Sequence, residues 1–284
     1  MYKRLLAAAA VMTGMILLLY PFLADLLYAA RTEGVISVLD EAADEENGDE
    51  QVREMLADAE SYNQRLREAY MPVPDLKAPE EGLAGKEKEY ESLLSFDRAG
   101  VIGYVSIPCI DVELPIYHGT SEEVLKKGAG HLYGTSLPLG GESTHTVITA
   151  HTGFGRARFF TDLTEVKKGD LFTITIPGRR LIYQADQIKV ARPEDTSDLV
   201  IEEGKDYCTL ITCTPYGINS HRLLVRGVRV QEKAAFLEKA GEDHQHEWLA
   251  SEWVTHYLFS LLTAAAVMTG AAAVITVIRR MRKA

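Results

Sequence analysis

The chain has 284 residues, 46% of them hydrophobic, which is enough for one large domain or two small ones. It carries 41 acidic residues against 30 basic ones, giving a formal net charge of −11. Several basic residues lie in the two tails, so the region between the tails is more acidic still. Because binding to the phosphate backbone requires a basic surface, this excess argues against nucleic acid as a partner.

Two uncharged runs lie near the two ends of the chain. The first extends from Leu5 to Ala24 after two basic residues, and the second extends from Tyr257 to Ile278 before four basic residues. A membrane-spanning helix needs about 20 apolar residues, and flanking segments rich in Lys and Arg stay on the cytoplasmic side. The sequence therefore predicts transmembrane anchors over residues 1–30 and 255–284. Both termini would lie in the cytoplasm and the region between the anchors outside the cell.

A cleaved signal peptide is the alternative to an anchor for the first run. The sequence that leads out of it, Leu27-Tyr28-Ala29-Ala30, lacks small residues at both of the positions that a signal peptidase reads. An uncleaved anchor is therefore the preferred prediction.

Residues 31–94 divide into a helical stalk and a loop. The chain from Arg31 to Tyr70 is acidic and helix-prone, with apolar residues at roughly helical spacing and a break near Asn47-Gly48. Three prolines then fall within residues 71–85, where they forbid a regular helix. This proline segment is predicted to be a loop.

From Gly100 onward, short β-rich runs alternate with clusters of Gly, Pro and Asp, a pattern typical of an all-β barrel or sandwich. This β domain is predicted over residues 95–231, and a polar helical connector over 232–254 leads to the second anchor. The predicted strands cover residues 101–107, 112–116, 145–150, 171–176, 181–190, 207–212 and 222–230.

The chain has three cysteines, Cys109, Cys208 and Cys213. An odd number in an exported region leaves at least one thiol free unless it pairs with another chain. A bridge between Cys109 and Cys208 is compatible with the sequence but cannot be argued from it. The free thiol therefore needs a role.

The segment TLITCTPYGINSHRLLVRG, residues 209–227, has the pattern of a β-hairpin. One strand ends at Cys213, a loop follows, and the next strand starts near Arg222. The two residues would then be neighbours at one edge of the sheet. A fixed positive charge lowers the pKa of a thiol and can stabilise the oxyanion that forms when a thiolate attacks a carbonyl.

His151 ends the run THTVITAH, where a strand would pass into a glycine-containing loop. Its imidazole could pair with the thiolate of Cys213 and later protonate a leaving amine. Taken alone, each of these residues has a more ordinary interpretation. A strand cysteine is more often a small buried hydrophobe, and an arginine such as Arg222 is more often a solvated charge.

Cys213 in TLITC, followed nine residues later by Arg222 and preceded by His151 at an upstream strand end, resembles the signature of the sortases. The stretches GYVSIPCIDVELPIYHGTSEEVLKKGAGHLYGTSLPLGG and ARFFTDL are similar to the pilus-assembling class C sortases, and the resemblance covers about residues 62–230. It implies a mainly β fold, an eight-stranded sortase-type barrel with an N-terminal helical segment between two transmembrane helices. It also implies a cysteine transpeptidase without cofactor or metal.

By this resemblance, Cys213 attacks the Thr-Gly bond of an LPxTG-like sorting signal, His151 serves as acid and base, and Arg222 steadies the carbonyl oxygen. The implied partners are pilin or surface proteins that carry such signals, and the acceptor is a pilin lysine. One alternative is a sortase that anchors surface proteins to cell-wall peptide amines. Another is a catalytically silent membrane scaffold that binds sorting signals. Hydrolysis also stays available, because a thioester reacts with water as well as with amines.

Class C sortases commonly carry a lid with an Asp-Pro-aromatic motif before the barrel. The corresponding place here contains Asp75 and Leu76 but lacks the proline and the aromatic residue in the matching positions. The sequence therefore predicts a weaker or differently built lid. Asp75 could still pair with Arg222.

The remaining histidines have no spacing typical of a metal site, so no metal is expected. The acidic run over residues 40–50 lacks the periodic loop of a calcium site and is interpreted as solvated. His118 and His131 match family positions outside the catalytic set. His221, His244 and His246 are set aside as well.

Overall fold

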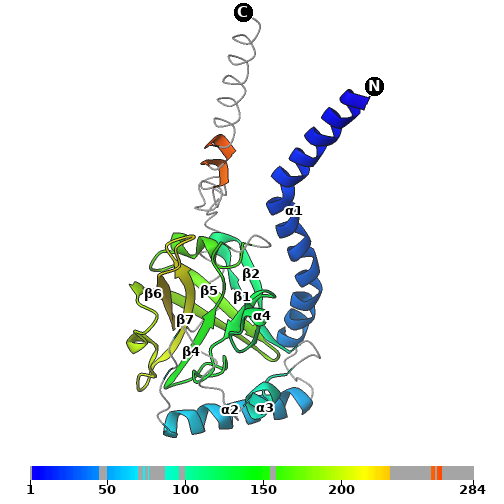
Figure 1. The fold of residues 1–284 in the computed structure, drawn as a ribbon. Coiled ribbons are helices and arrows are strands. Elements are labelled where there is room, and N and C mark those ends of the chain that lie inside the picture. The colour runs from blue at the N-terminus through cyan, green and yellow to red at the C-terminus, as the bar shows by residue number, and fades with distance from the viewer. Residues whose placement is uncertain are drawn as a thin grey trace, which may run out of the picture. The chain divides into compact units, whose positions relative to one another are not determined.

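The computed structural model describes residues 2–44, 50–69, 73, 76, 87–95, 100–153, 158–230, 257–259 and 261–263. It contains a closed eight-stranded barrel with the strand order β1-β2-β3-β4-β7-β8-β6-β5 (Figure 1). The predicted mainly β barrel is confirmed. The strands are β1 Val101–Ile107, β2 Val112–His118, β3 Ala129–His131, β4 Thr144–Thr149, β5 Leu171–Ile176, β6 Arg179–Ala191, β7 Asp206–Thr214 and β8 His221–Arg229.

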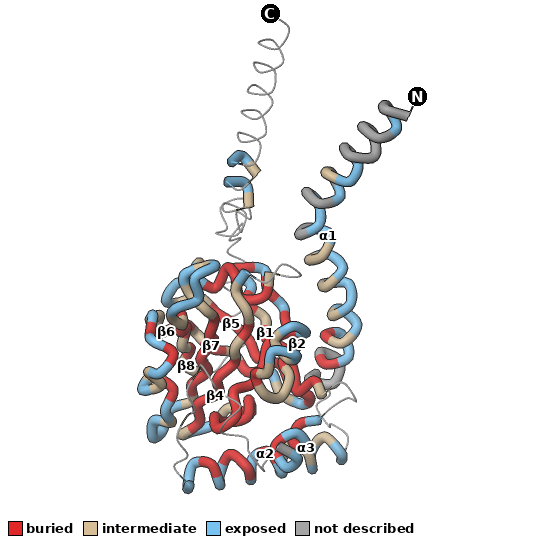
Figure 2. The backbone as a smooth tube through the Cα atoms, in the orientation of Figure 1, coloured by how far each residue is buried: buried red, intermediate tan, exposed pale blue. Residues whose placement is uncertain are grey.

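Strand β3 has no counterpart among the predicted runs, because three residues are too few for a period of two to stand out. The other strands are rich in the β-branched residues that suit a pleated, half-buried surface. Their inward side chains form one apolar core, and Figure 2 shows the barrel strands as largely buried. Its fully buried members include Ile102, Val105, Ile107, Ile116, Ile148, Ile174, Leu210 and Val225.

Three helices precede the barrel: α1 Tyr2–Asp44, α2 Glu50–Ala69 and α3 Glu87–Ser92. Helices α1 and α2 cover the described part of the predicted stalk, and the break near Asn47-Gly48 lies outside the described residues. Helix α2 is fixed to the barrel by Asn63, which donates to the Leu137 carbonyl at 3.0 Å and accepts from the Leu137 amide at 2.8 Å. Helix α3 inserts Tyr90, whose hydroxyl lies 2.7 Å from Nδ1 of His131.

Short helical turns lie between the strands: α4 Glu122–Leu125, η2 Pro108–Ile110, η3 Thr161–Glu165 and η4 Ser197–Leu199. The chain divides into two compact units, Met1–His244 and Gln245–Ala284, and the barrel belongs to the first. Within the parts of the chain that the structure describes, no helix has both the length and the apolar character that a membrane crossing requires. The predicted connector over residues 232–254 lies outside the described residues.

Two strand pairings bring the ends of three strands together. Strands β7 and β8 form an antiparallel hairpin, and β4 lies parallel to β7 on its other side. The end of β4, the end of β7 and the start of β8 therefore meet at one end of the barrel.

Candidate active site

Cys213 and Arg222 are direct partners across the β7–β8 hairpin. Residues opposite each other in an antiparallel pair have Cα atoms about 4.5–5.5 Å apart and side chains on the same face. The predicted proximity of the thiol-bearing and guanidinium-bearing residues is thus present in the strand register. Both residues are partly exposed.

His151 reaches the same place through the parallel pairing of β4 with β7. The last register pair is Thr149 with Ile211, and the Ala150 amide then donates to the Ile211 carbonyl at 3.1 Å. The Thr212 hydroxyl donates to the Ala150 carbonyl at 2.9 Å. Because these two segments stay in register beyond the ends of the strands, His151 lies opposite Cys213.

The surroundings of His151 adjust its basicity. Its pKa is lowered by partial burial, an effect that the nearby Glu122 carboxylate opposes and Lys126 reinforces. The Glu122 carboxylate, from helix α4, lies 3.9 Å from Nε2 of His151. The imidazole is therefore mainly neutral at pH 7 and able to take up a proton. Sequence reasoning missed Glu122, which carries no local signal because it lies far upstream of the histidine.

The guanidinium of Arg222 is held by backbone carbonyls. It donates to the carbonyl oxygens of Asn219 at 3.3 Å and His221 at 3.2 Å, and Nη2 donates to the Leu76 carbonyl at 3.3 Å. No carboxylate among the described residues forms an ion pair with it. Carbonyl groups fix the direction of the side chain without cancelling its charge.

Leu76 joins the proline segment to this edge of the barrel. Besides accepting from Arg222, its amide donates to the Pro193 carbonyl at 3.1 Å. The side chains of Val73 and Leu76 pack on an apolar cluster on the outer face of the sheet. Asp75, the residue expected to pair with Arg222, lies outside the described residues. The members of the cluster are Leu132, Val147, Ala191, Leu199, Ile211 and Leu224.

Comparisons with known proteins identify the family of the chain. The sortase domain family matches residues 105–230. Sortase C-1 from Actinomyces oris is 44% identical, with a TM-score of 0.60 over 65% of this chain and 100% of that chain. The chain belongs to the sortase family.

Other relatives support the same assignment. Sortase C1 from Streptococcus agalactiae is 41% identical, with a TM-score of 0.62 over 71% of this chain and 100% of that chain. Sortase D from Bacillus subtilis is 29% identical over 174 residues, which are 59% of this chain and 83% of that protein. Sortases are cysteine transpeptidases, so this chain is an enzyme of that type, and its structural neighbours are class C sortases.

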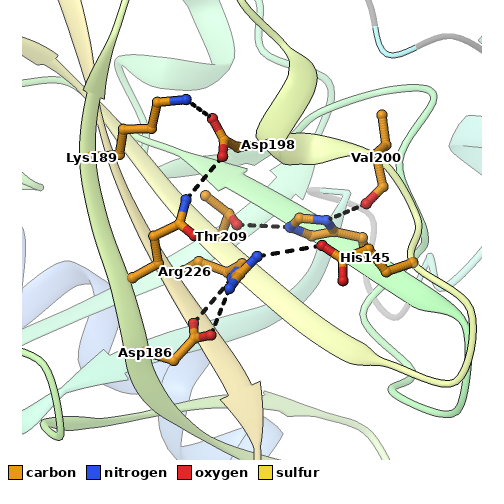
Figure 3. Close-up of polar contacts among 9 residues, drawn as sticks. His145, Asp186, Lys189, Asp198, Val200, Thr209 and Arg226 are labelled. Carbon is orange, nitrogen blue, oxygen red and sulfur yellow. Dashed lines mark hydrogen bonds and ion pairs between the residues drawn. The ribbon is translucent and has the colours of Figure 1, made fainter.

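A buried polar layer lies further along the same strands of this sortase (Figure 3). The strand register puts it on the face that carries Cys213 and Arg222. His145 on β4 is only 1% exposed, and both of its ring nitrogens have partners. Nδ1 lies 2.9 Å from the Val200 carbonyl, and Nε2 lies 2.7 Å from the Thr209 hydroxyl. Burial lowers the pKa of His145 to about 4.

Arg226 on β8 occupies the same layer. It binds Asp186 with two hydrogen bonds, from Nε at 3.1 Å and from Nη2 at 2.7 Å, and Nη1 lies 3.6 Å from Glu202. Its guanidinium also stacks 4.2 Å from the centre of the Tyr207 ring. Sequence reasoning missed this layer because its acidic members lie on β6 and in the β6–β7 loop, where a lone carboxylate is usually solvated.

The same layer holds the β6–β7 loop of the sortase against the barrel. Asp198, in η4, accepts from Gln187 at 3.0 Å and pairs with Lys189, both on β6. Together with the contact between His145 and Val200, these bonds fix the middle of the loop. The start of the loop carries Pro193, the partner of Leu76.

The other cysteines of the sortase are buried or half-buried. All three thiols are free, so the Cys109–Cys208 bridge that the sequence left open is not formed. Burial, with help from Asp170, raises the pKa of Cys109 to about 12, and burial raises that of Cys208 as well. Neither thiol is suited to act as a nucleophile.

The histidines set aside at the outset have structural partners where they are described. His118 Nε2 lies 2.6 Å from the Leu93 carbonyl, and His131 is buried between Tyr90 and Ser136. Within the described residues, no group of three His, Cys, Asp or Glu side chains could hold a metal ion. His244 and His246 lie outside those residues.

Proposed function

We propose that this sortase polymerises pilin subunits, with Cys213 as nucleophile, His151 as acid and base, and Arg222 as the donor to the oxyanion. The observation that carries the proposal is the strand register, which pairs Cys213 with Arg222 and brings His151 level with them. Similarity to class C sortases favours a pilin substrate over other sortase substrates.

The first half-reaction forms a thioester. His151 accepts the proton of the Cys213 thiol, and the thiolate attacks the carbonyl carbon between Thr and Gly of an LPxTG-like signal. Arg222 stabilises the oxyanion of the tetrahedral intermediate. The C–N bond then breaks, the leaving glycine amine takes the proton from His151, and the acyl group stays on sulfur.

The second half-reaction transfers the acyl group to an amine. A neutral lysine amine of a second pilin attacks the thioester carbonyl, and the C–S bond breaks as the new amide C–N bond forms. His151 receives the proton of the amine and returns it to the Cys213 sulfur. The product is an isopeptide bond between threonine and lysine, and the enzyme is regenerated.

We further propose that the proline segment acts as a lid over this site. The Leu76 carbonyl accepts a hydrogen bond from Nη2 of Arg222, so it would compete with the substrate oxyanion for this guanidinium, and we expect the segment to move when substrate binds. Deleting residues 71–80 should speed labelling of Cys213 by a thiol reagent, with Cys213→Ala as the blank. Unchanged labelling would mean that no lid protects the thiol.

The enzyme is also proposed to be held in the membrane by residues 1–30 and 255–284, with the barrel outside the cell and both termini in the cytoplasm. The support is the two uncharged runs and the basic residues beside them. Reporter fusions at each terminus and in the loop after Gly141 should give cytoplasmic, cytoplasmic and extracellular signals. A terminal fusion with an extracellular signal would contradict this topology.

The function is tested by incubating the full chain with a pilin that carries an LPxTG-like signal. Mass spectrometry should detect a thioacyl adduct on Cys213 and an intermolecular Lys-Thr isopeptide, both absent in Cys213→Ala. Adduct formation followed by transfer only to cell-wall peptide amines would favour the anchoring enzyme. A wild-type protein without any adduct would favour the silent scaffold and overturn the proposal.

A further inference from the structure

A second concave site lies at the far end of the barrel from Cys213. It is a groove of about 980 Å³ between helix α2, the β5–β6 turn and the loop that follows β3. Its lining includes Thr144 at the start of β4 and Arg229 at the end of β8. The candidate active site lies at the opposite ends of these strands, so the groove is separate from it. In Figure 1, α2 crosses this end of the barrel.

Four arginines line the groove, although the protein as a whole is acidic. We call it the arginine groove and define it by Arg67 on α2, Arg179 and Arg180 on β6, and Arg229 on β8. Two carboxylates, Glu60 and Glu142, also line it. Basic side chains thus outnumber acidic ones in the lining, and they come from three different elements.

Two of these arginines are held in position by main-chain carbonyls. Arg67 donates to the Glu142 carbonyl at 3.0 Å, and Nη1 of Arg179 donates to the Leu139 carbonyl at 3.2 Å. Arg179 also forms an ion pair with Glu60, which neutralises one charge of the groove. The bond of Arg67 to a carbonyl fixes its side chain but leaves its charge in place.

The side chain of Arg229 provides the observation that indicates a ligand. Its Nη1 is buried, and no described residue accepts a hydrogen bond from it. Asp206 interacts with Arg229 through charge, but the hydrogen bonds to its two oxygens come from the Gly141 amide at 2.7 Å and the Tyr183 hydroxyl at 3.0 Å. The Tyr183 ring lies 5.7 Å from the guanidinium carbon and covers one face of it. A buried charged donor without an acceptor is costly, so an oxyanion in the groove would relieve that cost.

We propose that the arginine groove binds the phosphate group of a larger anionic ligand. The planar fork of N–H donors on an arginine matches the oxygens of a phosphate group. Glu60 neutralises only Arg179, and a phosphate carries more negative charge than one carboxylate, so it suits the remaining arginines. The groove is far larger than one phosphate group, which leaves room for the rest of the ligand. The proposal is independent of the transpeptidase function.

Inorganic phosphate is the first probe, titrated into the full chain at constant ionic strength with chloride as the balancing anion. We expect phosphate to raise the Tm of the wild type and to bind with measurable heat. Arg229→Gln should weaken phosphate binding by about tenfold or more, because one charge-assisted donor is lost. Arg53→Gln is the matched control: it removes the same charge from α2 outside the groove, where Arg53 pairs with Glu50, and should leave binding unchanged.

Equal phosphate binding by the wild type and Arg229→Gln would overturn the proposal, as would stabilisation that chloride reproduces. If Arg229→Gln does not fold, the double variant Arg67→Gln/Arg180→Gln replaces it, with cleavage of an LPxTG-type peptide as the test of folding. Glycerol phosphate and phosphatidylglycerol vesicles then distinguish a soluble ligand from a lipid as the source of the phosphate group. Binding of glycerol phosphate alone indicates a soluble or polymeric phosphate, whereas groove-dependent sedimentation with vesicles indicates a lipid headgroup.

Discussion

Arg222 and Arg226 lie on the same face of β8, and their surroundings differ in kind. Arg226 is neutralised by Asp186 and Glu202 and covered by the Tyr207 ring. Arg222 is held only by carbonyl oxygens among the described residues, so its charge stays available at the edge of the sheet. The strand thus places an arginine neutralised by carboxylates four residues from one that is bound only by carbonyl oxygens among the described residues.

The two histidines of β4 and its extension repeat this contrast. Both ring nitrogens of His145 are occupied, and its side chain is almost fully buried. His151 is more exposed, and its basicity depends on the balance between burial and the Glu122 carboxylate. The side chain of His145 is therefore fixed by its two partners, whereas the imidazole of His151 is suited to the proton transfers proposed for it.

The largest expected effect separates the two arginines by activity. Arg222→Gln should reduce turnover by about 10²–10³-fold, because a preorganised donor to the oxyanion is lost. Its free energy of unfolding should change little, since the native partners are carbonyls at a partly exposed edge. Peptide cleavage rates and urea unfolding measure the two quantities. Near-normal turnover would remove Arg222 from the catalytic set.

The second-largest effect is expected at His145, in the dependence of the free energy of unfolding on pH. The folded-state pKa of His145 is about 4, below its usual value of 6.5, so the unfolded chain binds more protons between these values. The free energy of unfolding should fall by up to about 1.4 kcal/mol per pH unit for this histidine as pH drops from 6.5 to 4. Urea unfolding of the wild type and His145→Asn measures the slope. If His145→Asn kept the same slope of unfolding free energy against pH as the wild type, the lowered pKa assigned to His145 would be wrong.

Arg226→Gln should cost stability, by about 2 kcal/mol, because it leaves Asp186 without its bidentate partner in a partly buried site. Turnover per folded molecule should stay within a few-fold of the wild type, in contrast to Arg222→Gln. Urea unfolding and active-site titration provide the two measurements. A loss of turnover equal to that of Arg222→Gln would show that the two regions are not separate.

The smallest effect is expected at the rim of the buried layer. Asp198→Asn weakens the bonds to Lys189 and Gln187, but the ion pair is partly exposed to solvent, and such pairs contribute little to stability. The Tm should fall by no more than a few degrees, with kcat unchanged. A drop comparable to that of Arg226→Gln would place Asp198 in the rigid layer itself.

Some contacts of the candidate site and the polar layer could be predicted from the sequence, and others could not. Cys213 and Arg222 are close in sequence, so hairpin chemistry alone brings them together. The position of His151 beside them depends on the parallel pairing of β4 with β7, which no local pattern specifies and which only the family resemblance suggested. Glu122 and Asp186 reach their partners through contacts between segments that are far apart in the sequence, so these contacts could not be predicted from spacing.

The same reasoning applies to the barrel and the lid. Period-two runs predicted most strands, but β3 was too short to be recognised. The Leu76 contact with Arg222 is made by a main-chain carbonyl, which every residue possesses. Side-chain motifs such as Asp-Pro-aromatic therefore could not indicate it.

The parallel pairing of β4 with β7 has a consequence for how the enzyme matures. Parallel neighbours need a long crossover, here one that includes β5 and β6, so this contact forms late relative to local hairpins. Until it forms, the thiol of Cys213 has its arginine neighbour but no base beside it. On the proposed mechanism, the thiol of a newly made chain would therefore gain its base only after β4 has paired with β7.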